Sequence, residues 1–197
     1  MTGKTHLVFG LALALAALEP RGVPAACGAV AGAAIGSVIA DIDMQAAGNR
    51  AERKVILPAA LGVTALAFIV DAFLGGALRD TLIAQADALD FVCLALFLGA
   101  CLAGAIAGHR SFMHSLTALG LLGGLCALFA PPLAPAFAIG YGSHLLLDLT
   151  NKKGLPLLFP FKRRQCLKWF KSDGIADKLT LGLSAAALAV WFALTAR

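Results

Sequence analysis

Seven apolar segments separated by short polar stretches constrain this chain more than any other feature of its sequence. About 20 helical residues are needed to cross the ~30 Å hydrocarbon core of a bilayer. Hydrophobic residues make up 60% of the chain and charged residues 14%, whereas soluble domains average about 25% charged. We therefore predict an all-α fold, a polytopic helical membrane bundle with about six to seven apolar spans in a single domain over residues 1–197. The segments are Leu7–Leu18, Val23–Ala40, Val55–Leu74, Leu89–Gly108, Phe112–Ala130, Leu133–Leu149 and Leu179–Ala196.

The first segment, Leu7–Leu18, is short for a full span. A secretory signal peptide is the alternative interpretation, with Lys4 in its charged region and Leu7–Leu18 as its apolar region. Cleavage would remove His6 from the polar set described below. We therefore expect the segment to be retained in the bundle.

Basic residues predict the orientation, because Lys and Arg are enriched in cytoplasmic loops. If the N-terminus is cytoplasmic and the segments alternate, 13 of the 16 basic residues fall on the cytoplasmic side, eight of them in the loop 152–178. We predict a multi-pass protein of a bacterial-type inner (plasma) membrane with a cytoplasmic N-terminus. The net charge of +5 is explained by this loop, so no nucleic-acid partner is expected.

Histidines and aspartates lie at those ends of the apolar segments that this orientation places in the cytoplasm. Since the charge count used only Lys and Arg, this agreement is independent of it. Ionisable groups near membrane depth are costly and usually functional, so we predict a site that faces the cytoplasm. Asp71 and Asp90 fall toward the other surface, where we expect them to be solvated at helix ends. The candidate ligands are His6, Asp41, Asp43, His109, His114, His144 and Asp148.

The spacing within pairs supports convergence of the ligands. His144 and Asp148 are four residues apart, which places both on one face of a helix. A structural hydrogen bond between them is the alternative to a shared metal ion. Asp41 and Asp43 point the same way if the chain is extended there.

His109 and His114 are five apart and would diverge on a straight helix. A turn at Arg110, with Ser111 capping the next helix, would let both rings face one pocket.

Imidazole and carboxylate ligands without thiolate suit zinc, and also manganese or iron. The five cysteines contain no Cys-x-x-Cys pair. Seven ligands exceed the three or four of one catalytic zinc, so one or two ions are expected. Such a centre generates hydroxide near neutral pH and stabilises charge on a phosphoryl or carbonyl oxygen.

The loop 152–178 interleaves apolar and aromatic residues with basic ones. Lys162, Arg163 and Arg164 follow an apolar stretch and precede Trp169 and Phe170. This pattern favours the headgroup region of a membrane. Membrane lipid is therefore the expected partner, with these three basic residues binding an anionic headgroup or lipid-linked phosphate.

An ordered set of motifs runs through most of the chain: Thr5-His6, Ile39 to Asp43, His109 to Ser115, Ser143-His144 with Asp148, Gly154, and Pro160-Phe161. This set resembles the YdjM-like family of inner-membrane metal-dependent hydrolases, also labelled LexA-binding. Where that family has Pro-Asp-x-Asp, Ala40 replaces the proline, which affects the loop and not a ligand. The family is distantly similar to zinc-dependent phospholipase C and the S1/P1 nucleases, although their N-terminal Trp ligand has no evident match here.

The resemblance implies a membrane-embedded metal-dependent hydrolase that cleaves a phosphoester, of a lipid or lipid-linked molecule, at the cytoplasmic leaflet. Asp43 is the expected general base and Arg110 the residue that holds a phosphate oxygen. A transporter of a metal ion or small solute is one alternative, but charges are lacking in the middle of the spans. A non-catalytic regulatory protein that binds a cytoplasmic partner through the basic loop is another.

Overall fold

The computed structural model describes residues 1–42, 50–84, 86–106, 111–152, 154–161 and 163–195, with only the backbone at 50–53. Within these ranges the regular structure is helical, and β-pairing is limited to two isolated bridges. The helices are α1 (Gly3–Leu18), α2 (Val23–Ile39), α3 (Arg50–Phe73), α4 (Ala77–Ala84), α5 (Ala88–Ile106), η2 (Phe112–His114), α6 (Leu116–Phe129), α7 (Ala134–Leu149) and α8 (Ile175–Thr195).

Each predicted apolar segment overlaps one of the long helices, which confirms the all-α fold. Four helical stretches have the length and composition to cross a membrane: Val23–Ile42, Lys54–Phe73, Ala88–Ile106 and Ile175–Thr195. Helices α1 and α6 are apolar but shorter. The number of complete spans therefore stays a prediction.

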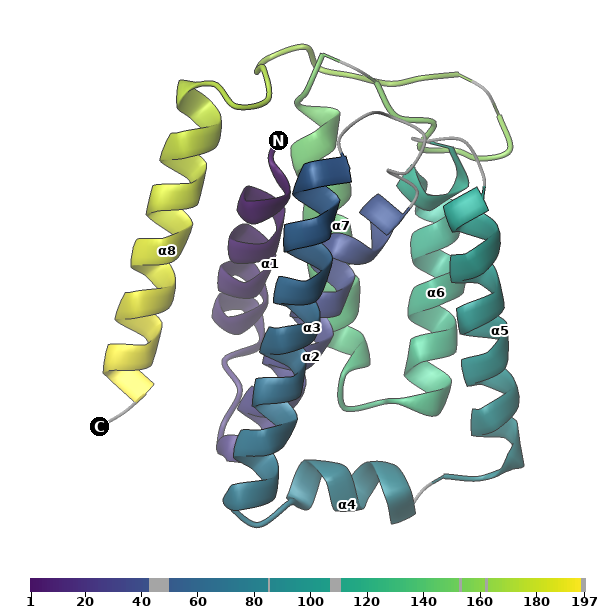
Figure 1. Cartoon of the computed structure of the whole chain (residues 1–197), viewed down its shortest axis with the longest axis vertical. Coiled ribbons are helices and arrows are strands. Elements are labelled where there is room, and N and C mark those ends of the chain that lie inside the picture. Colours follow the sequence, from purple (N-terminus) through teal and green to yellow (C-terminus); the bar gives the residue numbers. More distant parts are fainter. Residues whose placement is uncertain (43–49, 85, 107–110, 153, 162, 196–197) are drawn as a thin grey trace.

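The long helices run roughly side by side, and α4 lies across one end of the bundle (Figure 1). We call that end the lower end. The opposite, upper end carries the N-terminus, the last turn of α2, η2, the end of α7 and the connection from α7 to α8. Every described member of the predicted polar set is at this upper end or within the helix turns next to it.

The closest packing joins α2 to α7. A Cβ added at Gly32 or Gly36 would collide with the backbone carbonyls of Leu133 and Phe137, and one at Gly140 would collide with that of Ala33. Small residues at a helix interface let backbones approach closely inside a membrane. This contact places the end of α2, and with it the turn that carries Asp41, beside the end of α7.

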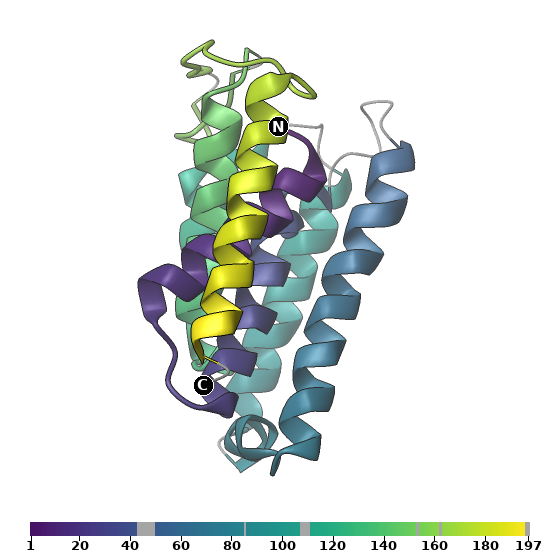
Figure 2. The ribbon, with the colours of Figure 1, turned by 90° about the vertical axis from the view of Figure 1, so that its left-hand side faces the viewer.

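Helix α8 lies at the edge of the bundle beside α1 (Figure 2). Leu179, Leu183 and Val190 are exposed on it, as are Leu66 on α3 and Leu102 on α5. Hydrocarbon chains are as apolar as these side chains, so an outward-facing apolar surface suits a bundle surrounded by lipid.

Asp71 is buried at the lower end, so the expectation that it is solvated is wrong. Its side chain is 1% exposed, and its two carboxylate oxygens accept hydrogen bonds from the backbone N–H groups of Leu78 and Arg79, each at 3.0 Å. These donors belong to α4, a helix that was not predicted. Asp71 thus satisfies the free N–H groups at the start of α4.

Candidate metal centre

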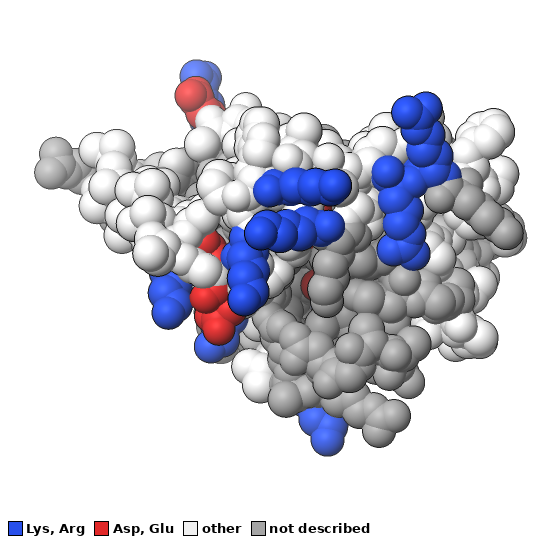
Figure 3. All heavy atoms as spheres, turned by 90° about the horizontal axis from the view of Figure 1, so that it is seen from above, with Lys and Arg blue, Asp and Glu red and all other residues white. Residues whose placement is uncertain are grey.

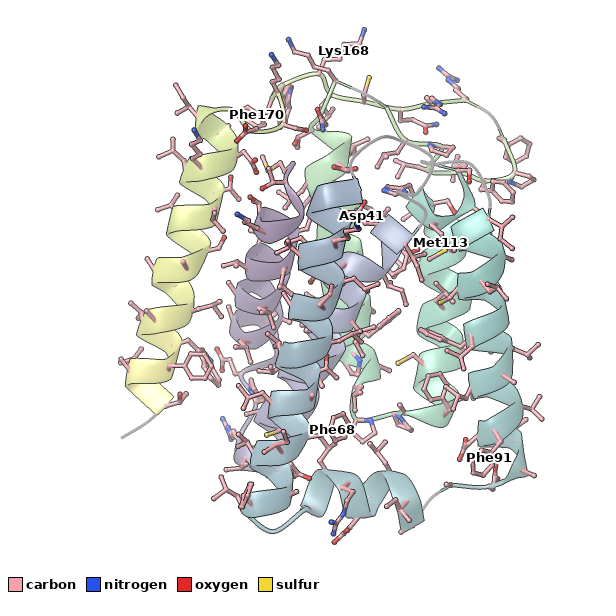
Figure 4. All side chains as sticks on the ribbon, in the orientation of Figure 1. Asp41, Phe68, Phe91, Met113, Lys168 and Phe170 are labelled. Carbon is pink, nitrogen blue, oxygen red and sulfur yellow. The ribbon has the colours of Figure 1, made fainter. Side chains whose placement is uncertain are left out.

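Five described members of the predicted set meet at the upper end. They come from four places in the chain, namely α1, the turn after α2, η2 and α7: His6, Asp41, His114, His144 and Asp148. Figure 4 shows Asp41 at this end, beside Met113 of the η2 turn. Asp43, His109 and Arg110 lie outside the described residues, so their predicted roles stay predictions.

The separations between candidate ligand atoms suit a metal ion. His6 Nε2 lies 3.3 Å from Asp148 Oδ1. Asp41 Oδ1 lies 3.5 Å from His114 Nε2 and 3.6 Å from His144 Nε2. Ligands bonded at about 2.1 Å to a tetrahedral zinc are about 3.4 Å from one another. The donors therefore need little movement to enclose an ion.

The candidate ligands form two groups that share one histidine. His6, His144 and Asp148 form the first, and Asp41, His114 and His144 form the second, with the ligand atoms of each group within 4.8 Å of one another. His144 Nδ1 is occupied by a hydrogen bond, so only Nε2 can bind a metal. One imidazole nitrogen binds one ion, and the two groups therefore compete for His144.

The protonation of His144 is set by the backbone of α2. Its Nδ1 donates a hydrogen bond to the Ser37 carbonyl at 2.7 Å, and since a carbonyl only accepts, Nδ1 carries the proton. In a neutral ring the Nε2 lone pair is then directed into the cluster, where Asp41 Oδ1 lies 3.6 Å away. Two electron-rich atoms at this separation favour a cation or a further proton between them.

The stacking of two histidine rings disfavours a further proton on His144 as the way to relieve its repulsion with Asp41. The rings of His6 and His144 are stacked, with centroids 3.9 Å apart and an interplanar angle of 20°. Two positive charges at about 4 Å repel by ~4 kcal/mol at an effective dielectric of about 20. A metal ion leaves both imidazoles neutral and compensates the carboxylates, so the donor set fits a divalent cation.

The described residues of the cluster differ in their exposure to solvent. His6, His114, His144 and Asp148 are at most 2% exposed, whereas the side chain of Asp41 is 17% exposed. The amino group of Met1 lies 3.0 Å from Asp148 Oδ1, which adds a positive charge to the first group. Among the described ligands of the cluster, Asp41 is therefore the most exposed to solvent.

Two predicted local geometries are wrong. Asp41 lies in a 3₁₀ turn that continues α2, and the chain there is not extended. Ser111 makes no capping hydrogen bond, whereas the Ser115 side chain accepts one from the N–H of Ala118 at 3.1 Å and so caps α6. The turn before α6 is therefore longer than predicted, and His114 is inside it.

The partner of His144 was missed by reasoning from side chains. Ser37 contributes its carbonyl, which every residue type possesses, so no side chain marks it. Its place on α2, four residues before Asp41, is the available signal. Metal-bound histidines typically donate their second N–H in this way.

The connection between α7 and α8 spans residues 150–174, and we call its described residues, 150–152, 154–161 and 163–174, the strap. Lys178 of the predicted basic loop belongs to α8. Leu155 and Gln165 exchange two backbone hydrogen bonds of 2.8 Å. The N–H of Leu116, at the start of α6, donates to the Leu157 carbonyl at 2.9 Å. The strap thus ties the end of α7 to the helix that follows η2.

Basic side chains of the strap are spread over the upper face (Figure 3). Arg163 and Arg164 are exposed, as are Lys168 and Trp169, while Lys162 lies outside the described residues. Lys168 and Phe170 stand above the helix ends in Figure 4. The upper face therefore combines cations with aromatic side chains.

Comparison with known families gives a match over nearly the whole chain. The sequence model of the YdjM inner membrane protein family matches residues 1–196. The chain belongs to this family. The YdjM match includes every candidate ligand and confirms the resemblance seen in the motifs.

A curated relative is the Bacillus subtilis (strain 168) protein named "Uncharacterized protein YvsG". It is 32% identical over 77 residues, which cover 38% of this YdjM-family chain and 48% of the relative. The match thus spans about half of that protein's length. No solved structure matches the chain.

Proposed function

We propose that this protein is a membrane-embedded, metal-dependent hydrolase that cleaves a phosphoester of a lipid or lipid-linked molecule. The observation that supports it best is the orientation of His144. Its Nδ1 hydrogen bond to the Ser37 carbonyl directs the Nε2 lone pair toward the Asp41 carboxylate at 3.6 Å. A divalent cation resolves that repulsion, and the family resemblance connects the cation with hydrolysis.

Zinc is the metal that the donors favour, since they offer imidazole and carboxylate without thiolate. His144 would be the common ligand, joined by His6 and Asp148 or by Asp41 and His114. A bound zinc supplies a hydroxide nucleophile near neutral pH and stabilises charge on the phosphoryl group. Because His144 offers one nitrogen, a second ion would need ligands beyond these two groups.

Asp41 has the position expected of the group nearest to the substrate. It is the partly exposed member of a cluster that is otherwise buried, and catalytic metal sites keep one position open. Asp43, two residues further on, is proposed as the general base. Arg110, four residues before His114, is proposed to hold a phosphate oxygen.

The upper face suits a lipid substrate at the cytoplasmic leaflet. Arg163 and Arg164 offer bidentate donors for phosphate, and Lys162 is proposed to join them. Exposed Phe161 and Trp169 favour the headgroup region. The excess of basic residues at this end supports a cytoplasmic orientation.

The test uses the full chain reconstituted in vesicles of phosphatidylglycerol and phosphatidylethanolamine with added zinc. Mass spectrometry of the lipids should show a headgroup or phosphate product that is lost in His114→Ala. Ser184→Ala, which removes a buried hydroxyl from α8, should retain full activity. A zinc-loaded protein that yields no cleaved phosphoester from these lipids would contradict the proposed substrate class.

A further inference from the structure

The turn that carries His114 is too short to hold its own shape. It comprises Phe112–His114, and short 3₁₀ turns are weakly hydrogen-bonded. Within it, the N–H of His114 donates to the Ser111 carbonyl at 3.3 Å. The position of the His114 ring therefore depends on what packs against the turn.

One contact to the turn comes from α7. Tyr141, the single tyrosine of the chain, is 0% exposed, and its hydroxyl donates to the Met113 carbonyl at 2.5 Å. That carbonyl belongs to the peptide bond between Met113 and His114. This hydrogen bond fixes the orientation of the peptide plane next to the Cα atom of His114, from which the His114 side chain projects.

Tyr141 lies on the same face of α7 as two candidate ligands. It precedes His144 by three residues and Asp148 by seven, spacings that align side chains along one helix face. The phenol hydroxyl therefore joins the helix that supplies His144 and Asp148 to the turn that supplies His114.

The other side of the turn is held by α5. Met113 is 0% exposed, and a Cβ added at Gly104 would collide with its sulfur. Met113 is therefore clamped, its side chain against α5 and its carbonyl against α7. This clamp fixes the peptide that bears His114 relative to α7, the helix that carries His144 and Asp148.

We propose that Tyr141 is a positioning residue of the metal site, which holds His114 at binding distance from the α7 ligands. The inference rests on the proposed function, because it requires that the cluster binds a metal. The hydroxyl acts through the peptide that bears His114 and is not itself assigned as a ligand. Its loss should loosen the second group, Asp41, His114 and His144, more than it affects folding.

The test is Tyr141→Phe, which removes one oxygen and keeps the ring, in the full chain in detergent micelles. Cobalt(II) replaces zinc as a spectroscopic probe, and zinc affinity is measured by competition with a chelator. We expect zinc affinity to fall about tenfold and the cobalt ligand-field bands to shift, as for loss of a group that orients a ligand. Ser184→Ala is the matched control, since it also removes one buried hydroxyl hydrogen bond, from Ser184 to the Thr180 carbonyl.

The outcomes separate the two proposals. If wild-type protein binds cobalt and zinc but Tyr141→Phe has the same spectrum and affinity, the positioning role is overturned and the metal site stands. Unfolding temperatures of both variants show whether a change reflects stability alone. An equal loss of affinity in Ser184→Ala would also overturn the role, because it would trace the effect to general loosening. If the wild type binds neither metal, the proposed function itself fails.

Discussion

Buried aspartates at the two ends of this bundle have different surroundings. At the lower end, both carboxylate oxygens of Asp71 accept hydrogen bonds from backbone N–H groups of α4. At the upper end, Asp148 faces imidazole nitrogens, with His6 at 3.3 Å and His114 at 3.8 Å. A backbone N–H keeps its proton, whereas an imidazole nitrogen can lose its proton and bind a metal ion through the freed lone pair. Burial alone therefore does not identify a site, and the partner of the carboxylate does.

Asp177 belongs with Asp71 in this comparison, although it lies near the upper end. It is 2% exposed and accepts hydrogen bonds from the N–H groups of Thr2 and Asp173, at 3.2 Å and 3.1 Å. These contacts hold the start of α1 against the start of α8. A structural aspartate and a candidate ligand are thus equally buried near the same end of the bundle, and their partners distinguish them.

The largest effect is expected from His144, which both ligand groups share. His144→Ala should lower zinc affinity by about 100-fold or more, because neither group keeps three ligands without it. Chelator competition on the purified full chain measures the loss. Wild-type affinity in this variant would show that the ion is bound by other residues.

Replacing the aspartates tests the comparison directly. Asp148→Ala should weaken zinc binding about 10–100-fold. Asp71→Ala should leave zinc affinity unchanged but lower stability by about 1–3 kcal/mol, because two backbone donors lose their acceptor. Affinity and thermal unfolding are measured on both variants. Equal zinc affinities in the two variants would show that Asp148, at the upper end, contributes no more to metal binding than Asp71 at the lower end.

Acidification should release the metal from the upper end. Protons compete with metal for imidazole nitrogen, and unperturbed histidine has a pKa of about 6.5. Affinity should thus be greatest at neutral or higher pH and fall as the pH drops below about 6. Zinc binding measured between about pH 5 and 8 checks this. An affinity independent of pH would indicate that histidines do not bind the ion.

The smallest effect is expected from the strap. Arg163→Gln with Arg164→Gln should raise the KM for an anionic lipid several-fold, leave zinc affinity unchanged, and reduce the salt dependence of activity, because exposed charges are screened. Lys4→Gln, an exposed charge on α1 outside the strap, is the control. A similar increase with Lys4→Gln would assign the effect to net charge.

Much of this organisation could be predicted from the sequence. The length of the apolar segments predicts the helices. The alternation of spans places His6, His144 and Asp148 at one end, because each lies at or near the end of an apolar segment. The geometry of the turn before α6 could not be predicted in this way, since the cap of α6 depends on which of two serines, Ser111 or Ser115, accepts a hydrogen bond from the N–H of Ala118. The burial of Asp71 depends on α4, eight residues whose position is set by packing and not by periodicity. The Ser37 carbonyl and the Tyr141 hydroxyl require the α2–α7 crossing and the η2 turn, which arise only in the folded chain.

The metal content of the full chain, purified without chelator, tests the central claim most directly. Elemental analysis should find about one zinc, manganese or iron ion per chain, retained in Asp71→Ala and absent from His144→Ala. Less than about a tenth of an equivalent in the wild type, with no uptake of added zinc, would contradict a metal centre. Equal metal content in the two variants would contradict its location at the upper end.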